Sequence, residues 1–330
     1  MAKKPFKRKP KKEEKQSFSE EVSLRIIAGL EDGTAPWVKG WKAGSRQKFL
    51  PINVVSGNRY KGINVLALMT QGYSDHRWMT FKQAKDQGYH VRALEKGTRI
   101  QYWSFTGYAD RTDESGNVVV DDKGKTVKDK ITLENPFVRY AYVFNAQQVE
   151  GYPPLPPEPD EQIQVWDQSE RAEAIIAASG ARILFDQNDQ AFYLPIQDRI
   201  HMPSKAQFED TPSYYETMLH ELGHWTGSKQ RLGRDLSGTF GTPSYAKEEL
   251  RAEIASMMLG ETLDLGHNPD NHVSYIASWI KTLKEDHLEI FRAAADAEKI
   301  HNYIMAFDPS LTKEVQAKEF EEDTELELSL

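Results

Sequence analysis

The sequence contains no cysteine, which excludes disulfide bonds and thiolate metal ligands. Any metal ion must therefore be bound by His, Asp or Glu. No apolar run approaches the ~20 residues of a membrane-spanning helix. The N-terminus, MAKKPFKRKPKKEEKQ, is basic but lacks the apolar core and small-residue cleavage site of a secretory signal. These absences lead us to expect a cytoplasmic protein that has no membrane partner.

Acidic residues are scarce in the first half of the chain. Residues 1–150 carry 27 Lys and Arg against 17 Asp and Glu, a net charge of +10, although the whole chain has a net charge of −8. The first 16 residues, with eight basic and two acidic side chains, supply only part of this excess. A positive half in an acidic protein predicts a polyanionic partner for that half.

Two histidines four positions apart stand out in the second half, in the segment ETMLHELGHWTG. Four residues advance an α-helix by ~400°, so His220 and His224 lie on one side and can bind the same metal ion. Glu221 follows the first histidine directly and lies beside such an ion. From there it can take a proton from metal-bound water as a general base.

The residues around this motif predict a helix. Pro212 suits the first helical turn, Ser213 and Glu216 have the spacing of a capping box, and Gly227 can end the helix. This context favours a metal site over two chance surface histidines.

A third ligand is needed, and several residues are candidates. Gln230 stands where an extended motif has a third histidine, and a neutral amide binds zinc poorly. Downstream, EELRAEIAS places Glu249 and Glu253 four apart on one helical face. This arrangement resembles the glutamate-ligand zincins, in which the first acid binds the metal, so it favours Glu249 as ligand and Glu253 as the group that orients a histidine. The reverse assignment stays open, and His267 and His272 are weaker candidates. The metal would be Zn²⁺ or another divalent ion such as Mn²⁺.

The first half combines tryptophans with nearby cations, a composition suited to single-stranded nucleic acid. Aromatic faces stack on bases while cations follow the phosphates. Two tryptophans, Trp37 and Trp41, lie among Pro and Gly and are expected to be exposed on a loop. The candidate DNA contacts are Trp37, Lys39, Trp41, Lys42, Arg59, Tyr60, Lys61, Arg77 and Trp78.

Residues 98–106 and 136–149 alternate in period two and are rich in aromatics, which predicts strands. Only one face of each strand can be exposed, so roughly half of their aromatics are expected in the core. Those considered are Tyr102, Phe105, Tyr140, Tyr142 and Phe144. The polar stretch 107–130 between the strands is expected to form an exposed hairpin or insertion.

Long stretches of the chain resemble one family, the ArdC-type antirestriction proteins. In the first half these are GTAPWVKGW, SGNRYKGINVL, RWMTFKQA, LEKGTRIQYW and VFNAQQVEG. In the second half they are FYLPIQDRIHMP, YYETMLHELGHWTGSKQRLGRD, YAKEELRAEIAS and SYIASWIKTLKED. The resemblance covers roughly residues 18–307.

The resemblance implies a single-stranded-DNA-binding domain joined to a zincin-like metallopeptidase domain, in a protein by which a mobile element such as a conjugative plasmid protects its DNA from restriction. It implies metal binding by His220, His224 and an acid of the EELRAE segment, with Glu221 as general base. The alternative is a DNA-targeted metalloprotease whose main role is to cleave a host or DNA-associated protein.

We therefore predict an α+β protein of two domains, divided at the proline-rich segment GYPPLPPEPDE, which cannot continue a helix or a central strand. The first domain is mixed α/β and the second mainly helical with a small β-hairpin or sheet. The predicted divisions are a basic disordered tail (1–17), the DNA-binding domain (18–150), a linker (151–165), the zincin-like domain (166–307) and an acidic tail (308–330).

Overall fold

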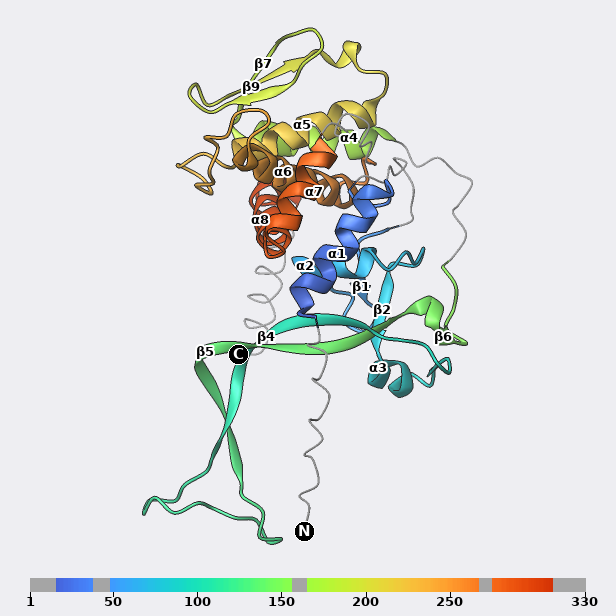
Figure 1. Ribbon diagram of the computed structural model, residues 1–330, viewed down its shortest axis with the longest axis vertical. Coiled ribbons are helices and arrows are strands. Elements are labelled where there is room, and N and C mark those ends of the chain that lie inside the picture. The colour runs from blue at the N-terminus through green and yellow to red at the C-terminus, as the bar shows by residue number, and fades with distance from the viewer. Residues whose placement is uncertain (1–15, 38–47, 156–164, 267–274, 311–330) are drawn as a thin grey trace, which may run out of the picture. The chain divides into compact units, whose positions relative to one another are not determined.

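The computed structural model describes residues 16–37, 48–155, 165–266 and 275–310. The chain forms two compact units (Figure 1). We call Gly44–Gln164 the sheet unit, and Met1–Ala43 together with Val165–Leu330 the helical unit. The predicted α+β architecture of two domains is confirmed. Within the described ranges, no helix is long and apolar enough to cross a membrane.

The sheet unit is built on four strands in the order β1-β2-β5-β4. Strands β1 and β2 are parallel, and the other neighbours are antiparallel. A separate antiparallel pair joins β3 to β6. The strands are β1 (Ile52–Asn53), β2 (Arg77–Thr80), β3 (His90–Val91), β4 (Thr98–Asp110), β5 (Lys128–Asn145) and β6 (Val149–Glu150).

Two short helices, α2 (Ile63–Met69) and α3 (Phe81–Asp86), give the sheet two small cores. Successive strand residues point to opposite faces, so Trp78 and Met79 enter different cores. Trp78 packs with Leu68 of α2, whereas Met79 packs with Ala84 of α3. The sheet is therefore covered on both faces near β2.

Strands β4 and β5 continue beyond these helices as a long two-stranded ribbon (Figure 1). A register shift between Ser104 and Thr106 interrupts the ladder, which then continues to the pair Asp110–Lys128. Further bridges join Thr112 to Val118 and Val120 to Thr126. The stretch 107–130 thus forms the exposed hairpin expected from its polarity.

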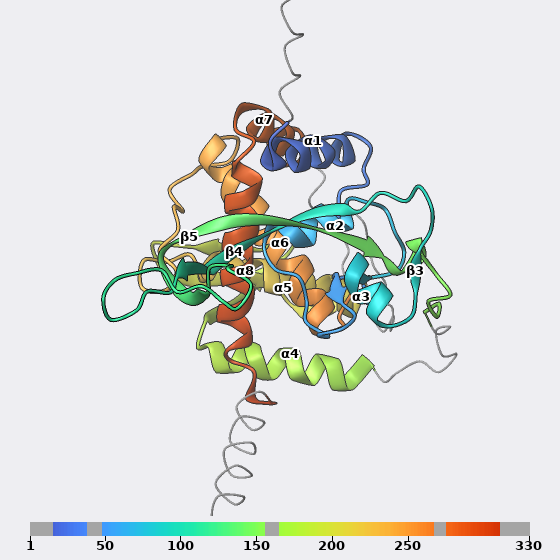
Figure 2. The ribbon, with the colours of Figure 1, turned by 90° about the horizontal axis from the view of Figure 1, so that it is seen from below.

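The described part of the helical unit contains six helices, and α6 is central to their packing. Helix α6 contacts α5, α7 and α8, and α1 contacts α7. Figure 2 shows the long helix α8 running across α5 and α6. The helices are α1 (Phe18–Glu31), α4 (Val165–Ser179), α5 (Thr211–Trp225), α6 (Pro243–Thr262), α7 (Ile276–Glu285) and α8 (Glu289–Met305).

A three-stranded sheet of β7 (Arg182–Gln187), β8 (Phe192–Leu194) and β9 (Arg199–Pro203) completes the helical unit. The alternation in ARILFDQNDQAFYLPIQDRIHMP predicts a hairpin with QND as its turn, which would pair β7 with β8, and this prediction is wrong. The order is β7-β9-β8, with β9 parallel to β7 and antiparallel to β8. Burial explains why β9, and not β8, lies next to β7. Ile200 and Met202 of β9 are fully buried, which suits the central strand of the sheet.

The N-terminal helix lies in the helical unit, whereas the division by sequence groups it with the DNA-binding domain. The spacing of Ser17 and Glu20 predicts a capped helix start here, and it is confirmed, since the Ser17 hydroxyl accepts a hydrogen bond from the backbone N–H of Glu20. Trp37, after this helix, is fully buried with its ring centroid 6.3 Å from that of Trp279. The prediction that Trp37 is an exposed DNA contact is therefore wrong, because its indole belongs to the core of the helical unit.

Candidate metal centre

Helix α5 carries the histidine motif and begins three residues before the predicted capping box. Its N-cap is Asp210, whose carboxylate accepts a hydrogen bond from the backbone N–H of Ser213 at 2.8 Å. Pro212 lies in the first turn, as predicted. The helix reaches Trp225, so His220 and His224 lie one turn apart on a continuous helical face.

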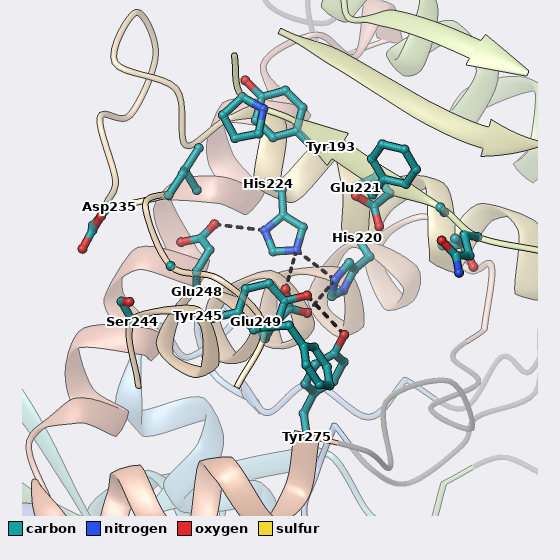
Figure 3. Close-up of a pocket in the computed structure, with 18 of the residues that line it drawn as sticks. Tyr193, His220, Glu221, His224, Asp235, Ser244, Tyr245, Glu248, Glu249 and Tyr275 are labelled. Carbon is teal, nitrogen blue, oxygen red and sulfur yellow. Dashed lines mark hydrogen bonds and ion pairs between the residues drawn. The ribbon is translucent and has the colours of Figure 1, made fainter. Parts of the chain in front are cut away.

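Three side chains from α5 and α6 converge on one point (Figure 3). The Nε2 atoms of His220 and His224 are 3.1 Å apart. The two carboxylate oxygens of Glu249 lie 3.4 Å from His220 Nε2 and 3.3 Å from His224 Nε2. In a tetrahedral zinc site with bonds of about 2.0–2.1 Å, neighbouring donors are about 3.3–3.4 Å apart. The donor set therefore fits a divalent metal ion.

Each histidine also contacts a carboxylate through its other ring nitrogen. Glu253 Oε2 is 3.3 Å from His220 Nδ1, and Glu248 Oε1 is 3.2 Å from His224 Nδ1. Such contacts fix the tautomer and the orientation of the ring. Glu249 thus lies on the Nε2 side of both rings, whereas Glu253 lies behind one of them.

Sequence reasoning missed Glu248 and its partner Arg234. The guanidinium of Arg234 holds the Glu248 carboxylate through contacts of 2.7 and 3.0 Å and donates to the backbone carbonyl of Gly223 at 2.7 Å. A Cβ at Gly227 would lie 2.9 Å from this guanidinium, so glycine is needed there for close approach. The local spacing of the histidine motif cannot reveal Arg234, because the loop after α5 must fold back to bring this residue to the helix.

The centre gathers charged groups away from water. Burial lowers the pKa of His220, but Glu249 and Glu253 outweigh it and hold that pKa well above the usual range. Burial also lowers the pKa of His224, but Glu249 and Glu248 outweigh this effect and raise that pKa to about 9. The pKa of Glu249 is lowered despite its burial, because it faces both histidines. Protons on the imidazoles thus balance the carboxylates when no metal is bound.

Glu221 lies beside the three converging side chains and has a different environment. It is 6% exposed, and its Oε2 has no hydrogen-bond partner among the described residues. Burial raises its pKa, while His224, His220 and a hydrogen bond from the backbone N–H of Tyr193 act in the opposite direction. A buried carboxylate with a spare oxygen and a raised pKa is suited to accept a proton.

The side chains of the metal centre line a cavity of about 750 Å³, and all of its lining residues belong to the helical unit. Strand β8 lines one wall, and Tyr245 and Tyr275 line another. The two tyrosine hydroxyls are 3.3 Å apart. Burial and the Glu249 carboxylate raise the pKa of Tyr245, so its hydroxyl stays protonated next to that carboxylate. The cavity is within the ~300–1,000 Å³ typical of small-ligand sites.

Lys39, Trp41 and Lys42 lie outside the described residues, as do the weaker ligand candidates His267 and His272.

The structure separates the remaining candidate DNA contacts by burial. Trp78 is 2% exposed in the core of the sheet unit, so its prediction as a stacking residue is wrong. Tyr60 packs partly against the same core, and Arg77 forms an ion pair with Asp75 at 2.7 Å. Lys61 is exposed and Arg59 is half-buried.

Comparison with known proteins agrees with this architecture. Residues 16–144 match the N-terminal domain of anti-restriction factor ArdC, and residues 170–296 match a zincin-like metallopeptidase domain. The crystal structure of the metal-free antirestriction ArdC protein from plasmid R388 is 34% identical, covers 89% of this chain and 99% of its own, and superposes with a TM-score of 0.65. The chain belongs to the ArdC antirestriction family. The Mn(II)-bound structure of the R388 ArdC protein is 32% identical with the same coverage and a TM-score of 0.66.

The ArdC family likeness extends to longer proteins. Two proteins of Escherichia coli named DNA primase TraC are 51% and 53% identical over 94% and 92% of this chain. The chain spans only 21% and 28% of their lengths. The uncharacterized protein y4eC of Sinorhizobium fredii (strain NBRC 101917 / NGR234) is 35% identical, over 87% of this chain and 91% of its own.

Proposed function

We propose that this ArdC-family protein binds single-stranded DNA through its N-terminal domain and carries a metal-dependent peptidase centre in its helical unit. In this role it protects the DNA of a mobile element from restriction in the cytoplasm. The observation that carries the peptidase assignment is the convergence of His220, His224 and Glu249 next to Glu221.

His220, His224 and Glu249 would hold the metal, Zn²⁺ or Mn²⁺, with Glu253 and Glu248 orienting the two rings. A bound divalent metal in such a site lowers the pKa of its water to about 7 and polarises a carbonyl. Glu221 would accept a proton from the attacking water as its oxygen adds to the peptide carbonyl carbon, and would return that proton to the amine that leaves when the C–N bond breaks. Burial raises the pKa of Glu221, which favours its holding a proton between the two transfers.

The cavity wall favours an extended peptide as the substrate. Strand β8 is an edge strand, paired in the described part of the chain with β9 alone. The backbone N–H of Tyr193 in this strand points to Glu221. An extended peptide that added to this edge would run past the metal ligands.

Glu221→Gln tests the catalytic part, because it removes the base and leaves all proposed ligands. We expect Mn²⁺ binding and oligonucleotide binding at the wild-type level, with casein hydrolysis lowered roughly 10²- to 10⁴-fold. The matched control is Glu285→Gln, an exposed carboxylate of α7. Undiminished hydrolysis by Glu221→Gln would contradict the mechanism.

The same variant separates protection from proteolysis when unmodified plasmid DNA enters a restricting host. Full protection by Glu221→Gln assigns antirestriction to DNA binding. Loss of protection with intact DNA binding would instead support the alternative, a protease that cleaves a host or DNA-associated protein.

DNA binding by the full chain is measured by anisotropy of a labelled oligothymidylate. We expect the logarithm of affinity to fall linearly with the logarithm of salt, by about 0.7 per phosphate neutralised. No binding, or binding that salt does not affect, would contradict this part of the proposal.

A further inference from the structure

The ribbon of β4 and β5 has one face with an unusual composition. Alternation along β4 and its register with β5 place six residues on this face, which we call the open face. They are Arg99, Gln101 and Trp103 from β4, and Val138, Tyr140 and Tyr142 from β5.

The aromatic rings of the open face are exposed, since among the described residues of the sheet unit no helix packs on them. The opposite face is packed, since Ile100 and Val143 lie in the core formed with α2. On the same side of the sheet as the open face, α3 packs around Phe144 and Met79. Trp103, Tyr140 and Tyr142 are 56%, 51% and 58% exposed, respectively.

Charge on the open face favours a polyanion. The guanidinium carbon of Arg99 lies 5.4 Å from the centroid of the Tyr140 ring, and no acidic side chain is among the six residues. Aromatic rings beside a cation offer stacking for bases and charge for phosphates, which an apolar protein partner would not require.

We propose that the open face is a stacking platform for unpaired bases of single-stranded DNA, with Trp103, Tyr140 and Tyr142 as the stacking rings and Arg99 as the neighbouring cation. This inference rests on the proposed DNA-binding function and adds the surface that performs it.

Spacing gives the platform a preference for single strands. Residues two apart on a strand are separated by about 6.7 Å, roughly twice the ~3.4 Å between stacked bases of a duplex. Bases that stack on Tyr140 and Tyr142 must therefore separate from each other. Paired bases in a duplex cannot do so without unstacking, so a duplex has no ring faces to offer.

Alanine substitution of the rings tests the platform. Stacking is worth about 1–3 kcal/mol per base, so we expect Trp103→Ala, Tyr140→Ala and Tyr142→Ala each to lower affinity for an oligothymidylate of about 20 nucleotides by roughly 5- to 150-fold. Tyr140→Phe and Tyr142→Phe keep the ring and should bind like wild type. A loss with phenylalanine equal to that with alanine would overturn stacking.

Two exposed aromatics serve as matched controls. Tyr102, 46% exposed, is a neighbour of Trp103 on the opposite face of β4, and Phe185, 57% exposed, lies on β7 in the helical unit. Tyr102→Ala and Phe185→Ala should change affinity less than about twofold. An effect of Tyr102→Ala as large as that of Tyr140→Ala would overturn the assignment to the open face.

Arg99→Gln tests the cation separately. It should reduce the slope of log affinity against log salt by about 0.7, whereas Tyr140→Ala should leave the slope unchanged. An unchanged slope in Arg99→Gln would overturn the role of this residue as a phosphate contact.

The outcomes separate the platform from the function on which it rests. If the wild-type chain binds no single strands, the proposed function fails. If it binds and all three alanine variants bind equally well, only the platform fails. If the alanine variants change the mass of the DNA-free protein in light scattering but not its DNA affinity, the open face is a self-association surface and the proposal is overturned.

Discussion

At the scale of single residues, the metal centre shows how two neighbouring acids take different tasks. Glu249 and Glu253 are one helical turn apart, yet Glu249 faces both Nε2 atoms and Glu253 faces only His220 Nδ1. A carboxylate that reaches both Nε2 atoms can share an ion with the rings. A carboxylate behind one ring can only orient it.

Metal affinity should follow this distinction. We expect Glu253→Gln and Glu248→Gln to weaken Mn²⁺ binding by roughly 10- to 100-fold, since each loses a group that orients a ring. Glu249→Gln should weaken binding more, because it removes a proposed ligand. Titration calorimetry measures all three, with Glu285→Gln as the control. A larger loss in Glu253→Gln than in Glu249→Gln would reverse the assignment.

The raised pKa of His224 predicts how pH affects the metal-free protein. Its folded pKa of about 9 exceeds the ordinary 6.5, so the bound proton contributes stability that is fully present below about pH 6.5 and is lost as pH rises through about 9. Bound Mn²⁺ replaces that proton. We therefore expect the gain in Tm on adding Mn²⁺ to increase between pH 6.5 and pH 9. A gain that shrinks over this range would contradict the prediction.

At the scale of secondary-structure elements, the features that could be predicted from the sequence are those set by the spacing of residues along a helix. The histidine pair four residues apart, the helix that carries it and the acid pair on the next helix all follow from helical periodicity. The structure brings these residues together. Pairing between distant strands has no such local marker, which is why the hairpin of β7 and β8 was predicted wrongly.

The spacing of aromatic residues along a strand also does not predict whether their side chains are exposed. Alternation shows that Tyr140 and Tyr142 share a face, but it does not show whether a helix covers that face. Core packing was expected for about half of the strand aromatics considered, yet only Phe144 of the five is not exposed. The opposite error occurs at Trp37 and Trp78, which were predicted as DNA contacts but are buried by tertiary packing.

The cap of α5 gives a prediction at this scale. Asp210→Ala removes the acceptor for the backbone N–H of Ser213 and should lower the free energy of unfolding of the helical unit by about 1 kcal/mol. Urea unfolding followed by circular dichroism measures the change. Asp210→Asn keeps a capping oxygen and serves as the control. Equal stability of the alanine and asparagine variants would mean that this cap contributes nothing.

At the scale of the whole molecule, the structural units and the sequence family divide the chain differently. The match to the ArdC N-terminal domain includes residues 16–144, yet α1 packs against α7 in the helical unit. The ring of Phe18 lies edge-on to Phe291, with centroids 5.7 Å apart. The helical unit is therefore built from both ends of the described chain, with the sheet unit inserted between them.

This division predicts opposite effects for two tryptophans of the same family domain. Trp37 is buried against Trp279, so Trp37→Ala should destabilise the helical unit by about 3–5 kcal/mol, and Trp37→Phe by less. Oligonucleotide affinity, measured below the melting temperature, should stay at the wild-type level in both variants. Trp103→Ala, at an exposed position, should show the reverse, with unchanged Tm and weakened DNA binding. Loss of DNA affinity in a folded Trp37→Phe variant would return Trp37 to the DNA-binding surface and contradict its place in the helical core.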